Sequence, residues 1–191
     1  AGAGRVPDAP WQDVDADRRL DHVVVGEWMP ITVFRNAGSG RLEALAVRGL
    51  EKSNGWWNRV VARDVTGDGR VDFVVGNLGM NSRLAATAER PATMHVKDFD
   101  RNGFVEQVVS LFNDSASYPL PLRDDLLGTL PPLRARFPKY EDYALAKVTD
   151  IFTTEELNEA IVREAYTFAS SIARNNGDGS FTLMPLPLEA Q

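Results

Sequence analysis

Short runs of apolar residues, many of them β-branched, recur along the chain, and polar, glycine or asparagine residues bound each run. Three of them are His22–Val25, Phe73–Val75 and Gln107–Val109. Runs of this length and composition predict β-strands. A fourth strand is predicted over Phe181–Met184, after the turn that begins at Asn175. No apolar run approaches the roughly 18 residues of a membrane-spanning helix, so we expect no membrane insertion.

The pattern changes over residues 122–168, where it predicts helices. Pro131, Pro132 and Pro138 divide the segment into short pieces. Thr153 and Glu156 have the spacing of a capping box at a helix N-terminus. The apolar residues predicted to share a helix face before this box are Tyr140, Tyr143, Ala144, Val148 and Ile151, and those after it are Leu157, Ile161, Ala165 and Phe168.

Acidic residues gather just before three of the predicted strands. Ten of the 27 acidic residues lie in three nine-residue loops, 13–21, 64–72 and 98–106, which we call the first, second and third acidic loops. Each loop has oxygen-bearing side chains at positions 1, 3, 5 and 9. These side chains are Asp13, Asp15, Asp17 and Asp21 in the first loop, Asp64, Thr66, Asp68 and Asp72 in the second, and Asp98, Asp100, Asn102 and Glu106 in the third.

This spacing is typical of a calcium site, because Ca²⁺ takes six to eight oxygen ligands and a tight loop can direct alternate side chains inward. The backbone carbonyl of position 7 is expected to add a neutral oxygen in each loop. Glycine at position 6 permits a positive φ in the second and third loops, whereas Arg18 stands there in the first, which predicts a weaker or distorted site. The position 7 residues are Arg19, Arg70 and Phe104.

The loops are not EF-hands. An EF-hand needs a glutamate at position 12 and helices on both sides, whereas position 12 here is Val24, Val75 or Val109. An ordinary solvated turn rich in Asp, Asn and Gly is the alternative for any one loop, but three loops with one spacing favour metal binding. The formal net charge of −6 would be neutralised by three Ca²⁺ ions. It also argues against nucleic-acid binding, which needs clustered Lys and Arg.

These loops, together with Val24–Pro30, Val74–Asn81 and Asn175–Phe181, resemble the FG-GAP/VCBS repeat family, which includes the propeller heads of integrin α chains. The resembling parts cover about two thirds of the chain. In that family the loops bind calcium and the fold is a β-propeller. The resemblance therefore implies a mainly β chain, a partial propeller of about three blades of antiparallel strands with a helical insertion.

Four segments follow from this interpretation: a loose lead-in at 1–10, propeller blades with the calcium loops at 11–121, the helical insertion at 122–168, and return strands at 169–191. Complete propellers have four to eight blades, and the chain ends at Gln191 where a further acidic loop would follow. We therefore expect a fragment of a longer propeller. Open strand edges predict self-association or pairing with the missing fragment.

The function implied is a calcium-binding repeat module with structural Ca²⁺, acting in extracellular or periplasmic binding and adhesion, or as a scaffold. Its partner would be a protein or a glycan. No signal peptide is visible in the chain, which begins at Ala1, and the absence of cysteine excludes disulfides and thiolate metal sites. The alternative is part of a propeller-based polysaccharide lyase or hydrolase, although no catalytic motif is present.

Overall fold

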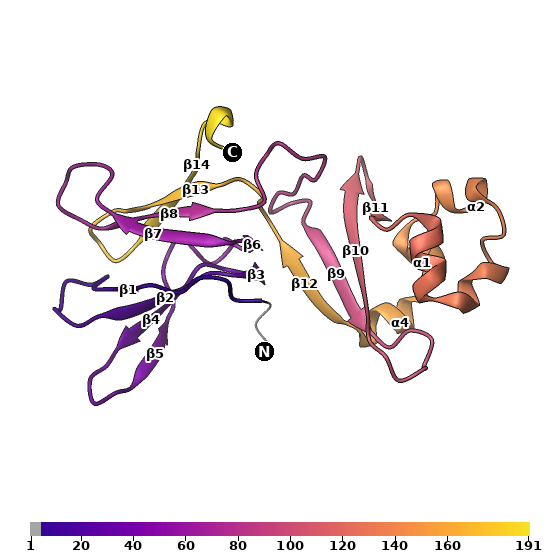
Figure 1. The fold of residues 1–191 in the computed structure, drawn as a ribbon, viewed down its shortest axis with the longest axis horizontal. Helices are drawn as coiled ribbons and strands as arrows, with labels where there is room; N and C mark the ends of the chain where they lie inside the picture. The colour runs from indigo at the N-terminus through magenta and orange to yellow at the C-terminus, as the bar shows by residue number, and fades with distance from the viewer. Residues whose placement is uncertain (1–4) are drawn as a thin grey trace. The chain divides into compact units, whose positions relative to one another are not determined.

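The computed structural model describes residues 5–191, so part of the predicted lead-in, residues 1–4, lies outside the described residues. The chain is mainly β and divides into two compact units. The first unit comprises Ala1–Glu89 and Ala165–Gln191, and the second comprises Arg90–Glu164. Within residues 5–191 the strands form three four-stranded sheets and one two-stranded sheet (Figure 1). This architecture confirms the predicted fold class, a mainly β chain consistent with a partial propeller.

The first sheet of the first unit has the strand order β1-β2-β4-β5, and all neighbouring strands are antiparallel. The first acidic loop joins β1 to β2. Residues 5–10 run beside β2, where the carbonyls of Asp8 and Pro10 accept hydrogen bonds from the N–H groups of Val25 and Val23 at 3.2 and 3.0 Å. The strands are β1 (Trp11–Gln12), β2 (Asp21–Val24), β4 (Thr32–Asn36) and β5 (Leu42–Leu45).

The second sheet of this unit repeats that order as β7-β8-β13-β14, again with antiparallel neighbours. The second acidic loop joins β7 to β8, as the first joins β1 to β2. The difference lies between the second and third strands, because residues 25–31 make that connection in the first sheet and residues 77–170 make it in the second. The second unit is therefore an insertion within this sheet. The strands are β7 (Arg59–Arg63), β8 (Asp72–Gly76), β13 (Ser171–Asn175) and β14 (Phe181–Pro185).

The core of the first unit follows from alternation along these strands. Val23 of β2, the adjacent Val25, and Phe73 and Val75 of β8 are completely buried in one apolar cluster. Trp57 is also buried there, and its indole N–H donates to the Ser53 carbonyl at 2.8 Å. The two-stranded sheet pairs β3 (Glu27–Met29) with β6 (Gly55–Trp56) beside this core. A short 3₁₀ helix, η2 (Leu188–Ala190), follows β14.

The second unit contains a sheet of order β11-β10-β9-β12, and the third acidic loop joins β9 to β10. Its helices pack on a separate apolar cluster that includes Phe99, Val108 and Leu126. Within residues 5–191 no helix is long and apolar enough to cross a bilayer. The elements are β9 (Ala92–Lys97), β10 (Glu106–Asn113), β11 (Ala116–Pro119), α1 (Arg123–Thr129), η1 (Pro131–Ala135), α2 (Tyr140–Ala144), α3 (Val148–Ile151), α4 (Thr154–Glu159) and β12 (Ile161–Ala165).

The capping box is confirmed, since Glu156 N–H donates to Thr153 Oγ1 at 3.2 Å and Thr153 N–H donates to Glu156 Oε2 at 2.7 Å. The helix predicted to continue through Phe168 is wrong, because α4 ends at Glu159 and β12 follows it. A spacing of four residues is even, so it places side chains on one face of a strand as well as on one face of a helix. The β-branched pair Ile161 and Val162 favours the strand.

Gly49 lets the segment that follows β5 lie directly against β14. Its φ is +88°, and a Cβ there would lie 1.8 Å from the carbonyl oxygen of Phe181. We expect Gly49→Ala to lower the free energy of unfolding by more than about 2 kcal/mol, measured by urea denaturation, because both the backbone strain and the clash must be relieved. Gly128→Ala is the control, since its Cβ would meet nothing within 4 Å. Equal losses for the two variants would contradict the prediction.

Tyr143 anchors α2 of the second unit. Its hydroxyl donates to the Pro121 carbonyl at 2.8 Å, and burial raises its pKa to about 12. A raised pKa means that this contribution to stability is complete below the ordinary tyrosine value near 10 and is lost as the pH rises through about 12. We expect tyrosinate absorbance to show a late ionisation near that pH, which Tyr143→Phe removes while lowering the free energy of unfolding by about 1 kcal/mol. An unchanged titration in the variant would contradict this assignment.

Candidate metal-binding loops

The three acidic loops share one backbone shape. In each, positions 4 and 6 adopt the left-handed conformation, with φ between 59° and 91°. The sequence analysis identified position 6 but missed position 4, because only the second loop has glycine there. Arg18 takes the left-handed conformation at position 6 of the first loop with φ 68°. The position 4 residues are Ala16, Gly67 and Arg101, and the position 6 residues are Arg18, Gly69 and Gly103.

The carboxylate at position 1 organises each loop. One of its oxygens accepts a hydrogen bond from the N–H of position 5 and the other from the N–H of position 6. This arrangement draws the loop around the carboxylate. The distances for positions 5 and 6 are 3.1 and 2.9 Å to Asp13, 3.3 and 2.8 Å to Asp64, and 3.0 and 2.9 Å to Asp98.

The carboxylate at position 9 is the first residue of the following strand and is buried in every loop. Asp21, Asp72 and Glu106 have exposed fractions of 1%, 0% and 4%. Each accepts a hydrogen bond from the N–H of position 2, at 2.9, 3.1 and 2.8 Å respectively. A buried carboxylate is costly unless hydrogen bonds satisfy it, so these contacts fix both the loop and the start of the strand.

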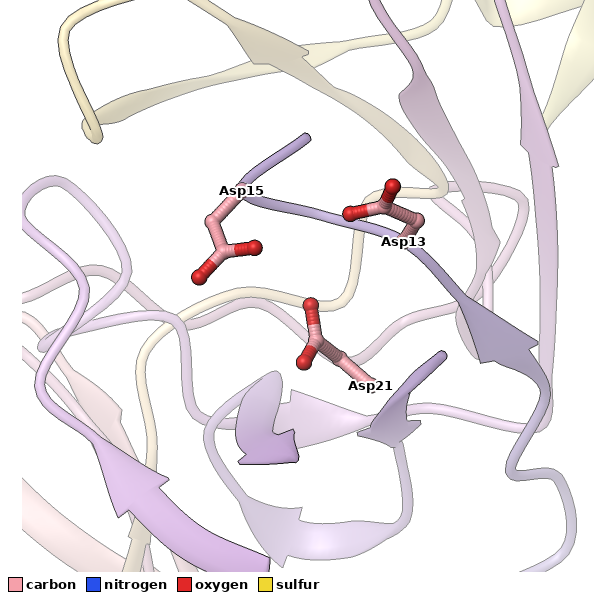
Figure 2. Close-up of side chains that lie close together, drawn as sticks. All are labelled: Asp13, Asp15 and Asp21. Carbon is pink, nitrogen blue, oxygen red and sulfur yellow. The ribbon is translucent and has the colours of Figure 1, made fainter. Parts of the chain in front are cut away.

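Carboxylate oxygens converge in two of the loops. One oxygen each from Asp13, Asp15 and Asp21 lie within 4.8 Å of one another, and Figure 2 shows the three side chains around a common space. The corresponding set in the third loop is Asp98, Asp100 and Glu106. Two oxygens bound to the same Ca²⁺ are at most about 5 Å apart, so each set fits around one ion.

The pKa values of two loop carboxylates, Asp15 and Asp64, are shifted in opposite directions. Burial, together with repulsion from Asp21, Asp17 and Asp13, raises the pKa of Asp15 above its usual value. A nearby cation would relieve this repulsion. In the second loop the N–H groups of Gly69 and other loop residues lower the pKa of Asp64, so its negative charge is already stabilised by the backbone.

Asp100 offers the most specific sign of a missing partner in the third loop. Its Oδ1 atom is buried and has no hydrogen-bond partner. Buried carboxylate oxygens are almost always paired, so the donor set of this loop fits a cation placed among Asp98, Asp100 and Glu106.

The remaining predicted ligands are arranged differently. The carboxylates of the second loop form no such convergent set within residues 5–191. Instead, Asp68 pairs with Arg70, and Thr66 Oγ1 lies 3.4 Å from Asp64 Oδ1 and 3.5 Å from Asp72 Oδ2. In the first loop Asp17 pairs with Arg19 and stands outside the converging set. In the third loop Asn102 Oδ1 accepts from the N–H of position 7 at 2.7 Å. The carbonyl ligands at position 7 stay predictions.

Comparison with known families agrees with this geometry. A family model described as an FG-GAP-like repeat matches residues 13–75. Residues 13–75 contain an FG-GAP-like repeat. The match begins at the first carboxylate of the first acidic loop and ends within β8, so it includes the first and second loops and the strands between them. No curated protein and no solved structure matched the chain.

The first and second acidic loops make a contact that the sequence analysis missed. In these two loops the position 9 carboxylate also accepts the N–H of an asparagine at the end of the third strand of its sheet. Asp21 accepts from Asn36 and Asp72 accepts from Asn175, both at 2.8 Å. The signal available in the sequence is the pattern Asn-x-Gly-x-Gly, which occurs at 36–40 and 175–179. The side chain of each asparagine accepts from the following turn, at Gly38 and Gly177 respectively.

Replacing the buried carboxylate of the second loop tests this contact. Asp72→Ala would leave the N–H groups of Val65 and Asn175 without their acceptor, so we expect a loss of roughly 2–4 kcal/mol in the free energy of unfolding. Urea denaturation in the presence of a chelator keeps metal binding out of the measurement. Asp125→Ala, at an exposed position of α1, is the control and should change the stability by less than about 0.5 kcal/mol. Similar values for both would show that the carboxylate does not hold the sheet together.

Proposed function

We propose that the chain is a calcium-binding FG-GAP-type module whose Ca²⁺ ions are structural. The observation that carries the proposal is the convergence of three carboxylates in the first and third loops, on a backbone shape that all three loops share. Oxygen donors of this kind suit a hard divalent cation, and the flexible loop suits the larger and less regular coordination shell of Ca²⁺ over that of Mg²⁺.

Calcium would act here by stabilising strand junctions. Each acidic loop joins two antiparallel neighbours, β1 to β2, β7 to β8, and β9 to β10. A cation held by positions 1, 3 and 9, with position 5 as the remaining predicted ligand, offsets the repulsion among the carboxylates and ties the loop to the first residue of the second strand. Because the unfolded chain cannot present these ligands together, the free energy of binding adds to the free energy of folding.

The setting we propose is extracellular or periplasmic, where the module would bind a protein or a glycan or serve as a scaffold. Calcium outside cells is present at millimolar concentration, which suits the weaker sites of extracellular modules. The family match and the acidic loops support this setting, and a chain without cysteine would need a staple other than a disulfide.

Thermal melting of the intact chain in EDTA and in millimolar Ca²⁺ tests the proposal. We expect calcium to raise the melting temperature, because a single site at 100 times its Kd adds about 2.7 kcal/mol. Asp100→Asn should leave the stability in EDTA nearly unchanged, since Asp100 Oδ1 has no hydrogen bond to lose, while removing the part of the calcium increment that comes from the third loop.

Asp125→Asn is the matched control, because it removes one charge from the same unit at an exposed helix position. It should keep the full rise in melting temperature that calcium produces. Metal analysis after dialysis gives an independent count of bound ions. No shift in melting together with no retained calcium would refute the proposed function.

A further inference from the structure

An arginine occupies position 7 of the first and second acidic loops and makes the same two contacts in both. The guanidinium of Arg19 pairs with Asp17, and that of Arg70 pairs with Asp68, in each case the carboxylate at position 5. The Nε–H of each arginine donates to a backbone carbonyl of the hairpin in its own sheet, Arg19 to Asn36 at 2.8 Å and Arg70 to Asn175 at 3.3 Å.

The hairpin between β13 and β14 provides room for the second of these arginines. A Cβ added to Gly177 would lie 3.1–3.2 Å from the Nε, Cδ and Cζ atoms of Arg70, so the guanidinium lies directly against this glycine. Two equivalent loops thus place a positive charge on the same carboxylate with the same backbone support.

The third loop has neither partner of this pair. Phe104 stands at position 7 with an exposed fraction of 76%, and the neutral Asn102 stands at position 5. The sets of convergent carboxylates also distinguish the third loop from the other two. Asp17 is left out of the set in the first loop, the second loop has no such set within residues 5–191, and in the third loop every acidic side chain belongs to it.

We propose that Arg19 and Arg70 set the calcium affinity of their loops by competing with the ion for the carboxylate at position 5. This inference rests on the proposed function. A guanidinium on Asp17 or Asp68 occupies the Oδ2 atom, which a cation could otherwise use, and repels an incoming divalent charge. Calcium binding therefore displaces the guanidinium from the carboxylate, and the first and second loops fill at higher calcium concentrations than their carboxylates alone would require.

Amide correlation spectra of the intact labelled chain, recorded during a calcium titration, report each loop separately through Arg18, Gly69 and Gly103. We expect Arg70→Gln to lower the calcium midpoint at Gly69 by about three- to tenfold, from the loss of an exposed ion pair and of the repulsion. The midpoint at Gly103 should not move. Arg19→Gln should act in the same way at Arg18.

A second test introduces the aspartate and the arginine into the third loop, so no existing ion pair has to be removed. Asn102→Asp should lower the midpoint at Gly103, because it adds a carboxylate. Adding Phe104→Arg to that variant should raise the midpoint by about three- to tenfold, because it supplies the competing guanidinium. Both positions are exposed, so neither change alters the core.

Arg59→Gln is the matched control, since it removes one positive charge from β7 at the end of the strand away from the second loop. It should leave all three midpoints unchanged. The competition is refuted if Arg70→Gln leaves the midpoint at Gly69 within about twofold of the wild-type value, or if Arg59→Gln shifts it equally. If no loop amide responds to millimolar calcium, the proposed function itself fails. If the loop amides respond to calcium but the arginine variants have the same midpoints as the wild type, the loops bind calcium without this competition.

Discussion

The buried carboxylate that ends each acidic loop is the constraint on which the rest of the structure depends. Asp21 and Asp72 each accept one hydrogen bond from the loop and one from the neighbouring third strand of the sheet, β4 or β13. A single side chain therefore fixes the loop, the start of its own strand and the register of a neighbour. The position of the hairpin follows from this anchoring, and the carboxylate at position 1 completes the shape of the loop.

Two sheets of the first unit are built on the same plan, yet only the first is continuous in sequence. The contact between the loop and the hairpin is the same in both sheets. The two hydrogen bonds made by the buried carboxylate have closely similar lengths in both sheets. The connection between the second and third strands is thus where this architecture accepts added chain. None of the hydrogen bonds described for the anchored loop is made by residues of this connection.

Local patterns predicted the structure where local contacts decide it. The three loops, the strands that follow them and the capping box at Thr153 depend on residues close in sequence, and the spacing of the side chains was sufficient to find them. The strand after Glu159 was missed because the spacing of Leu157, Ile161 and Ala165 fits either period. Pairing of Asp72 with Asn175, and of Arg70 with the same hairpin, depends on residues more than 100 positions apart. Such contacts leave no periodic signal in the sequence.

The discontinuity of the second sheet has a consequence for the order of folding. Asp21 meets Asn36 only 15 positions along the chain, whereas Asp72 meets Asn175 after 103. Closing the longer loop costs roughly 2 kcal/mol more in chain entropy if the intervening residues are unstructured. A nascent chain can thus complete the first sheet soon after its residues leave the ribosome, while β8 must wait for β13. If the inserted residues fold first, they shorten the effective distance between β8 and β13 and so lower this entropic cost.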